Sequence, residues 1–223
     1  MMTYFSQTIE DSEIRHITSN SYIHPIVKYG KRGFDLIFSL CALVILSPVL
    51  VCVAIAIKVD SKGPVFYLQT RSGQDKLFTI IKFRSMHTDA EKAGKALLAV
   101  KGDPRITPVG RFLRKTRLDE VPQFVNIIRG DMSLIGPRPE RPELTSEIEK
   151  KMPFFSERTY HVLPGITGLA QTKQSYLDSV NNIGQKLAFD HAYSLAITNP
   201  GNWLKTDLSI LIKTVLTVVK CNG

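Results

Sequence analysis

The chain has 223 residues, which is long enough for one domain with a substantial core, alone or with an appendage. Lys and Arg number 29 against 20 Asp and Glu, and the net charge of +9 suits nucleic acid, lipid headgroups or phosphate-bearing substrates without choosing among them. Three cysteines are too few for a disulfide framework, and no Cys/His spacing resembles a zinc site, so a reducing, cytoplasm-facing environment fits best. There is also no P-loop and no Gly-x-Gly-x-x-Gly fingerprint.

The first predicted element is an uncharged run of 22 residues at positions 36–57, LIFSLCALVILSPVLVCVAIAI. About 20 apolar residues are enough to cross a bilayer, so a plain transmembrane anchor is one interpretation. Basic residues flank both ends of the run, however, and a spanning helix cannot keep both sets on the cytoplasmic side. These flanking residues are Lys28, Lys31 and Arg32 before the run and Lys58 and Lys62 after it.

A Ser-Pro pair near the middle of this run also argues against a straight span. Pro48 has no N–H to donate to the carbonyl of Val44, so the helix should bend there, and the Ser47 hydroxyl can satisfy part of the freed backbone. A kinked helix that enters and leaves on the same side accounts for both observations. The sequence is therefore divided into a polar N-terminal extension (1–27), a re-entrant membrane hairpin with basic flanks (28–62) and a remaining domain (63–223).

Two β-rich runs follow, GPVFYLQTR (63–71) and LFTIIKFRSM (77–86), and the short polar segment between them predicts a hairpin. Cations alternate with apolar residues near the end of the second run, so one sheet face would present Lys82 and Arg84 to an anion. A plain amphipathic strand with a solvated basic edge is the alternative. The segment DAEKAGKALLAV (89–100) is predicted to be helical and carries no chemistry.

The densest chemistry lies in RKTRLDEVPQF (114–124), where Asp119 and Glu120 stand side by side behind Arg114, Lys115 and Arg117. Leu118, Val121, Val125 and Ile128 keep helical spacing, which predicts a helix that opens near Leu118 with Pro122 in its first turn. An acidic pair at a helix start is usually plain complementation of the helix dipole. The alternative is a nucleophile in an anion-binding pocket.

Two further motifs suit phosphate. In GPRPERP (136–142), Pro137 and Pro139 fix an extended backbone and hold Arg138 for bidentate phosphate recognition. PGITG (164–168) predicts a glycine-punctuated turn whose N–H groups can cradle phosphate.

The C-terminal segment NPGNWLKTDLSILIKTVLTVVK (199–220) has Trp203 at its start and a stripe of lysines, namely Lys205, Lys213 and Lys220. It is either a helix at the membrane interface or a core helix with a solvated stripe.

Taken in order, the basic-flanked Ser-Pro segment, KFRSM, RFLRKTRLDEVPQ, GDMSLIGPRP and PGITG closely resemble the monotopic phosphoglycosyl transferases, the bacterial sugar transferase family. The resemblance runs from Lys31 to the C-terminus. It implies an α+β monotopic membrane protein with a re-entrant helix-break-helix hairpin, broken at Ser47 and Pro48, and a mostly helical cytoplasmic catalytic domain containing a small β-hairpin. It also places the active site on the cytoplasmic face of the bacterial inner membrane.

The same resemblance implies transfer of a sugar 1-phosphate from a UDP-sugar to undecaprenyl phosphate, with Mg²⁺ as cofactor. Asp119 would be the nucleophile and Glu120 its acidic partner, both being candidate Mg²⁺ ligands. The cations expected at the substrate phosphates are Arg114, Arg138, Lys82 and Arg84. A carboxylate that attacks phosphorus gives an acyl phosphate and divides one difficult displacement into two steps, while the cations offset the charge of the diphosphate.

Two other functions stay open. In the first, the lipid phosphate attacks the nucleotide sugar directly, and the acidic pair only holds metal. In the second, the chain is a non-enzymatic, membrane-tethered basic module that binds anionic lipid or nucleic acid. Aromatic residues do not alternate with basic ones, which counts against nucleic acid. No residue singles out the sugar, and a homo-oligomer is left open.

Overall fold

The structure is a computed structural model that describes residues 23–74, 76–90, 102–153, 155–159, 162–173 and 180–219. Most of the expected N-terminal extension and positions 91–100 of the helix expected at 89–100 lie outside these ranges. Helices dominate and are joined by two small two-stranded sheets, so the α+β class is confirmed. In chain order the elements are α2 (Pro25–Asp60), β1 (Phe66–Ser72), β2 (Leu77–Phe83), α3 (Pro108–Thr116), the 3₁₀ helix η1 (Leu118–Gln123), α4 (Phe124–Arg129), β3 (Ser133–Ile135), α5 (Pro142–Lys151), η2 (Phe155–Thr159), β4 (Gly165–Thr167), α6 (Leu169–Lys173), α7 (Val180–Ala196) and α8 (Pro200–Val219).

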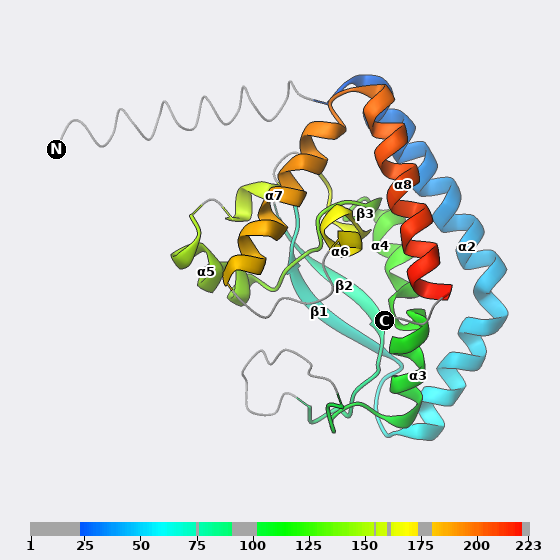
Figure 1. The fold of residues 1–223 in the computed structure, drawn as a ribbon. Helices are drawn as coiled ribbons and strands as arrows, with labels where there is room; N and C mark the ends of the chain where they lie inside the picture. The colour runs from blue at the N-terminus through cyan, green and yellow to red at the C-terminus, as the bar shows by residue number, and fades with distance from the viewer. Residues whose placement is uncertain are drawn as a thin grey trace.

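The apolar run forms α2, a helix of 36 residues that is continuous through Pro48. Within the described ranges it is the one helix long and apolar enough to cross a membrane. Figure 1 shows it bowed along its length. The expected break is thus corrected to a bend within a single helix, because the Ser47 hydroxyl donates to the Val44 carbonyl at 2.8 Å and satisfies it locally.

The N-terminal part of α2 is fastened to the rest of the chain by buried polar contacts. Arg32 donates to the carbonyls of Ile127 and Ile128 at 2.6 and 2.9 Å, at the C-terminal end of α4, where the Ile127 carbonyl also accepts the N–H of Gly130. Asp35, which is 2% exposed, accepts the N–H of Leu134 at 3.0 Å. Arg32 and Asp35 therefore bind backbone groups of the same chain.

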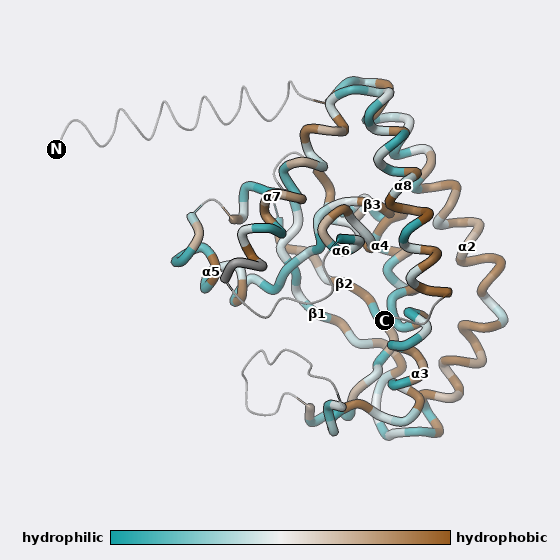
Figure 2. Tube along the Cα trace, in the orientation of Figure 1, coloured by the Kyte–Doolittle hydropathy of each residue, from teal (hydrophilic) through white to brown (hydrophobic). Residues whose placement is uncertain are grey.

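A second anchor joins α2 to α8. Lys31 forms an ion pair of 3.1 Å with Asp207, whose carboxylate also accepts hydrogen bonds from the Trp203 indole and the Tyr193 hydroxyl. Trp203 is buried in this cluster, so it is not the interfacial side chain that the sequence suggested. The two helices run along the same side of the molecule in Figure 1, and Figure 2 shows that α2 is apolar over most of its length whereas α8 mixes apolar and polar residues.

The predicted hairpin is confirmed: β1 and β2 pair antiparallel from Phe66–Phe83 to Ser72–Leu77. The core beneath it includes Ile80, Ile127 and Met132. A second apolar cluster, Val53, Ile57, Phe83 and Leu113, packs the C-terminal part of α2 against β2 and α3. Both ends of α2 therefore contact the same domain.

The PGITG segment is not the phosphate-binding turn that was expected. It forms β4, which pairs parallel with β3, and the N–H of Gly165 donates to the Pro137 carbonyl at 2.9 Å. A Cβ at Gly165 would lie 2.1 Å from the Gly136 nitrogen, so the glycine is required by close packing of two backbones.

Candidate functional site

The acidic pair lies in a sharp connection between two helices. Arg117 ends α3 in the left-handed conformation, at φ 59°, and η1 begins immediately after it. The predicted single helix is therefore a 3₁₀ turn that contains Pro122, followed by α4 from Phe124. The turn buries both carboxylates, Asp119 and Glu120, each 8% exposed.

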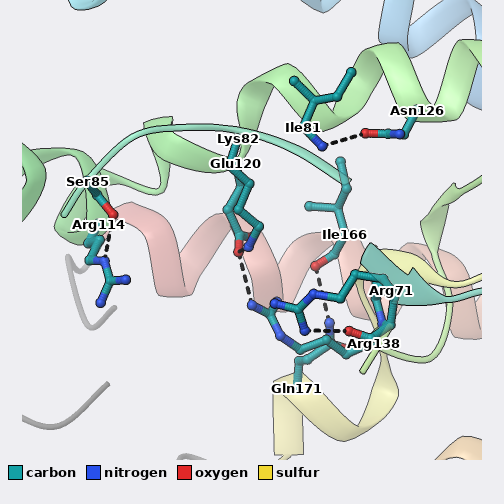
Figure 3. Close-up of polar contacts among 11 residues, drawn as sticks. Arg71, Ile81, Lys82, Ser85, Arg114, Glu120, Asn126, Arg138, Ile166 and Gln171 are labelled. Carbon is teal, nitrogen blue, oxygen red and sulfur yellow. Dashed lines mark hydrogen bonds and ion pairs between the residues drawn. The ribbon is translucent and has the colours of Figure 1, made fainter. Parts of the chain in front are cut away.

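Glu120 is held by two cations from different parts of the chain. Its Oε1 lies 2.8 Å from Lys82 Nζ on β2 and 3.1 Å from Arg138 Nη2 after β3 (Figure 3). Burial acts to raise the pKa of Glu120, but Lys82 and then Arg138 outweigh it and hold that pKa well below its ordinary value. Glu120 is thus an ionised group that fixes two cations beside Asp119.

Asp119 has the opposite environment. Its Oδ1 is buried and accepts no hydrogen bond from the residues that the structure describes. Burial, followed by the negative charge of Glu120, raises the pKa of Asp119 to about 6, although Lys82, Arg114 and Arg117 oppose the shift. An unsatisfied buried carboxylate oxygen is costly and suits a group that gains a partner when substrate or metal binds.

Lys82 is placed by a side-chain clamp on β2. The Asn126 side chain accepts the N–H of Ile81 at 3.0 Å, which ties α4 to the strand one residue before Lys82 (Figure 3). It also donates to the Thr79 carbonyl at 2.7 Å. Sequence reasoning missed Asn126, because a lone Asn in a helix carries no spacing signal.

Of the other predicted cations, Arg114 lies at the site and Arg84 does not. Arg114 donates to the Ser85 hydroxyl at 2.9 Å and is among the charges that lower the pKa of Asp119 (Figure 3). Arg84 is 5% exposed and donates to the carbonyls of Ser61 and Lys62 at 2.7 and 2.9 Å. The prediction for Arg84 is corrected: β2 ends at Phe83, and the side chain instead satisfies carbonyls at and beyond the end of α2.

Arg71 is a cation that the sequence did not single out. It donates to the Pro139 carbonyl at 3.0 Å, and burial followed by the charge of Arg138 lowers its pKa to about 10. Figure 3 shows the two guanidinium groups close together. Adjacent guanidinium groups repel one another, so an anion between them would be stabilised by both.

These residues fit Mg²⁺ in one specific way. The described part of the chain contains no group of three or more His, Cys, Asp or Glu able to hold a metal. Mg²⁺ commonly takes one or two carboxylates and completes its shell with water and substrate phosphates. The unpaired Oδ1 of Asp119 suits that arrangement, whereas Oε1 of Glu120 is already engaged by two cations.

Comparison with known proteins gives consistent matches. A family model described as bacterial sugar transferase matches residues 26–221. The chain is 41% identical over 196 residues to the UDP-N-acetylgalactosamine-undecaprenyl-phosphate N-acetylgalactosaminephosphotransferase of Aeromonas hydrophila, covering 87% of this chain and 45% of that protein. It is 37% identical over 192 residues to the UDP-glucose:undecaprenyl-phosphate glucose-1-phosphate transferase of Caulobacter vibrioides, covering 85% and 69%.

A third relative is the undecaprenyl-phosphate galactose phosphotransferase of Salmonella typhimurium, 36% identical over 216 residues, covering 88% of this chain and 42% of that protein. The chain thus spans less than half the length of the Aeromonas and Salmonella proteins. The three relatives differ in the sugar that their names specify.

Proposed function

Because the chain belongs to the bacterial sugar transferase family, we propose that it transfers a sugar 1-phosphate from a UDP-sugar to undecaprenyl phosphate and releases UMP. The relatives' names share undecaprenyl phosphate and differ in the sugar, which supports this substrate class and leaves the sugar open. The observation that carries the proposal is the asymmetry of the acidic pair: Glu120 is paired with two cations, and Asp119 has a buried, unpaired oxygen.

In the proposed mechanism, Asp119 is the nucleophile. A carboxylate oxygen of Asp119 attacks the phosphorus that carries the sugar, the bond from this phosphorus to the oxygen bridging it to UMP breaks, and UMP leaves with that oxygen. The sugar phosphate is then an acyl phosphate on Asp119. The phosphate oxygen of undecaprenyl phosphate attacks the same phosphorus, which forms the lipid diphosphate and restores the carboxylate.

The surrounding cations reduce the repulsion between Asp119 and the diphosphate. Glu120 fixes Lys82 and Arg138 beside it, so these charges need no reorganisation during the reaction. Arg114 and Arg71 add positive charge near the same place. Mg²⁺, held by Asp119 together with substrate phosphates, would supply further neutralisation of the diphosphate.

A monotopic arrangement follows from the same proposal. Both ends of α2 contact one domain: Arg32 and Asp35 do so near its start, and Val53 and Ile57 near its end. A spanning helix places its ends on opposite sides of the bilayer, where one small domain cannot reach both. The helix, about 54 Å long at 1.5 Å per residue, would enter the membrane with its exposed middle and return to the cytoplasmic face.

The outer face of α8 supports membrane contact beside α2. Large apolar side chains on it are at least half exposed and recur at helical spacing: Leu204, Leu208, Ile212, Val215, Leu216 and Val219. We therefore keep the division into a membrane segment (28–62) and a catalytic domain (63–223) with an interfacial C-terminal helix as part of the proposal.

The decisive experiment omits the lipid acceptor. The chain in detergent or nanodiscs is mixed with Mg²⁺ and each of several radiolabelled UDP-sugars, and UMP release is followed in the absence of undecaprenyl phosphate. About one equivalent of UMP per site, with the labelled sugar phosphate retained on the protein and released by hydroxylamine, is expected of the covalent route. Release of UMP only when lipid is present would instead indicate direct transfer.

A further inference from the structure

The segment that carries Arg138 is tied down at four successive carbonyls. Its two prolines have no N–H and hold φ fixed, so its carbonyls are the groups through which the backbone can be positioned. The donors come from four different residues: Gly165 N–H to Pro137 at 2.9 Å, Arg158 Nη2 to Arg138 at 3.1 Å, Arg71 Nη1 to Pro139 at 3.0 Å, and Ser72 N–H to Glu140 at 2.9 Å.

The donor to Arg138 itself is held by a buried ion pair from a distant helix. Arg158 on η2 lies 2.8 Å from Asp190 on α7, and the two side chains are 3% and 1% exposed. The Arg158 guanidinium is also stacked over the Phe155 ring at 4.4 Å. Arg158 therefore has little freedom, and its second terminal nitrogen is directed at the Arg138 carbonyl.

The same face of α7 reaches the segment a second time. Lys186, one turn before Asp190, forms an ion pair with the carboxylate of Glu140, and the two side chains are 6% and 13% exposed. Two ion pairs thus connect α7 to this segment: Lys186 pairs with Glu140 directly, and Asp190 pairs with Arg158, the donor to the Arg138 carbonyl. Since a buried ion pair often stabilises a fold no more than well-packed apolar side chains do, added stability alone does not account for this arrangement.

We propose that Arg158 and Asp190 are positioning residues for Arg138, acting on the transfer reaction without touching substrate. The inference rests on the proposed function, in which the Arg138 guanidinium faces both Glu120 and the substrate diphosphate. Bidentate recognition of phosphate depends on the placement of the guanidinium, and a misplacement of 1 Å can lower a rate about a hundredfold. The hydrogen bond from Arg158 to the Arg138 carbonyl holds the backbone from which the Arg138 side chain extends.

The test compares variants of the full chain in nanodiscs, using a UDP-sugar that the wild type turns over and undecaprenyl phosphate. Asp190→Asn is expected to lower kcat/KM between about tenfold and a hundredfold. Because that variant leaves Arg158 buried without its counter-charge and risks misfolding, a second variant replaces both residues, Arg158→Met with Asp190→Leu. This pair should keep the wild-type unfolding temperature and still show the loss, since the donor to Arg138 is gone.

A double-mutant cycle separates positioning from general damage. If Asp190 acts through Arg138, then Asp190→Asn in an Arg138→Ala background should lower kcat/KM by less than about threefold further. As a control for the loss of a carboxylate alone, Asp131→Asn breaks an ion pair with the exposed Lys76 and should stay within about twofold of the wild type.

Full activity of the apolar double variant, or losses that simply multiply in the cycle, would overturn the inference. A wild type that turns over no UDP-sugar would instead contradict the proposed function, and the inference with it.

Discussion

Asp119 and Glu120 are adjacent in the chain and equally buried, yet Glu120 contacts two cations, whereas Asp119 Oδ1 has no hydrogen-bond donor among the described residues. The pKa values of the two carboxyl groups move in opposite directions for this reason. One ionised carboxylate stabilises the fold at neutral pH, and its neighbour destabilises it.

The two corresponding amides should therefore change stability with opposite sign. The raised pKa of Asp119 means that stability is lost as pH rises toward and through about 6, so Asp119→Asn should raise the unfolding temperature at pH 7. The lowered pKa of Glu120 means that its charge contributes stability above the ordinary glutamate pKa, so Glu120→Gln should lower the unfolding temperature. Each change should be on the order of 2 kcal/mol, measured by thermal unfolding in one detergent. Shifts of the same sign would contradict the asymmetry.

The reaction of Asp119 should be visible in its pH dependence. A nucleophilic carboxylate must be ionised, so the second-order rate constant for the single burst of UMP release without lipid should rise about tenfold per pH unit up to about pH 6 and then level off. Leaving out the lipid removes the titration of the acceptor phosphate from the profile. If the rising part of this pH–rate profile lay near pH 4 instead, the free enzyme would not hold Asp119 in the buried, unpaired state.

The position of the rising part of the pH–rate profile also tests whether Mg²⁺ binds at Asp119. A bound cation favours the ionised carboxylate, so raising the Mg²⁺ concentration should move the rising part to lower pH. A rising part that stays in place while activity rises with Mg²⁺ would put the ion on the diphosphate alone.

Much of the site was predictable from local sequence. The β1–β2 pairing followed from alternation and from the short polar loop, and it places Lys82 on β2 as expected. The two prolines predicted a fixed Arg138, and its guanidinium lies 3.1 Å from Glu120, a neighbour that only the family resemblance implied.

What failed depended on contacts distant in sequence or on one unusual backbone angle. Arg117 adopts the left-handed conformation without being Gly or Asn, so no residue type marked the end of α3. As a result the buried face of η1 and α4 includes Gln123, Asn126 and Ile127. The residues with the predicted helical spacing, namely Leu118, Val121, Val125 and Ile128, are only partly buried. The contacts of Arg84 could not be predicted for another reason: its partners at the end of α2 lie 22 to 27 residues away in the sequence.

The corrected place of Arg84 gives a paired prediction with Arg114. Arg84→Met removes hydrogen bonds to Ser61 and Lys62 and should lower the free energy of unfolding by about 1.5–3 kcal/mol. Its kcat/KM per folded molecule should stay near wild type. Arg114→Met loses one hydrogen bond, to Ser85, and a charge near Asp119, so it should lower kcat/KM at least about tenfold, or 1.4 kcal/mol, with a smaller effect on unfolding. A large loss of kcat/KM in Arg84→Met, with little effect on unfolding, would show that Arg84 acts in the reaction after all.

The last prediction concerns the topology of α2. Single cysteines replacing the exposed Lys28 and Lys62, in a chain lacking Cys41, Cys52 and Cys221, should both react with a membrane-impermeant maleimide from the cytoplasmic side alone. A cysteine in place of Ile45, which is 73% exposed at the middle of the helix, should react from neither side, because lipid covers it.

Pro48→Ala tests the bend itself. It restores a backbone donor opposite the Val44 carbonyl, which the Ser47 hydroxyl now satisfies, and should straighten α2. Because Val53 and Ile57 pack on Phe83 and Leu113 while the start of α2 is fixed by Arg32 and Asp35, a straight helix cannot keep both sets of contacts. Activity should fall although Pro48 touches no substrate, and part of the protein should become reactive at position 62 from the opposite side. Labelling of the two wild-type flanks from opposite sides would rule out the re-entrant arrangement, since one domain would then have to contact the helix on both sides of the bilayer.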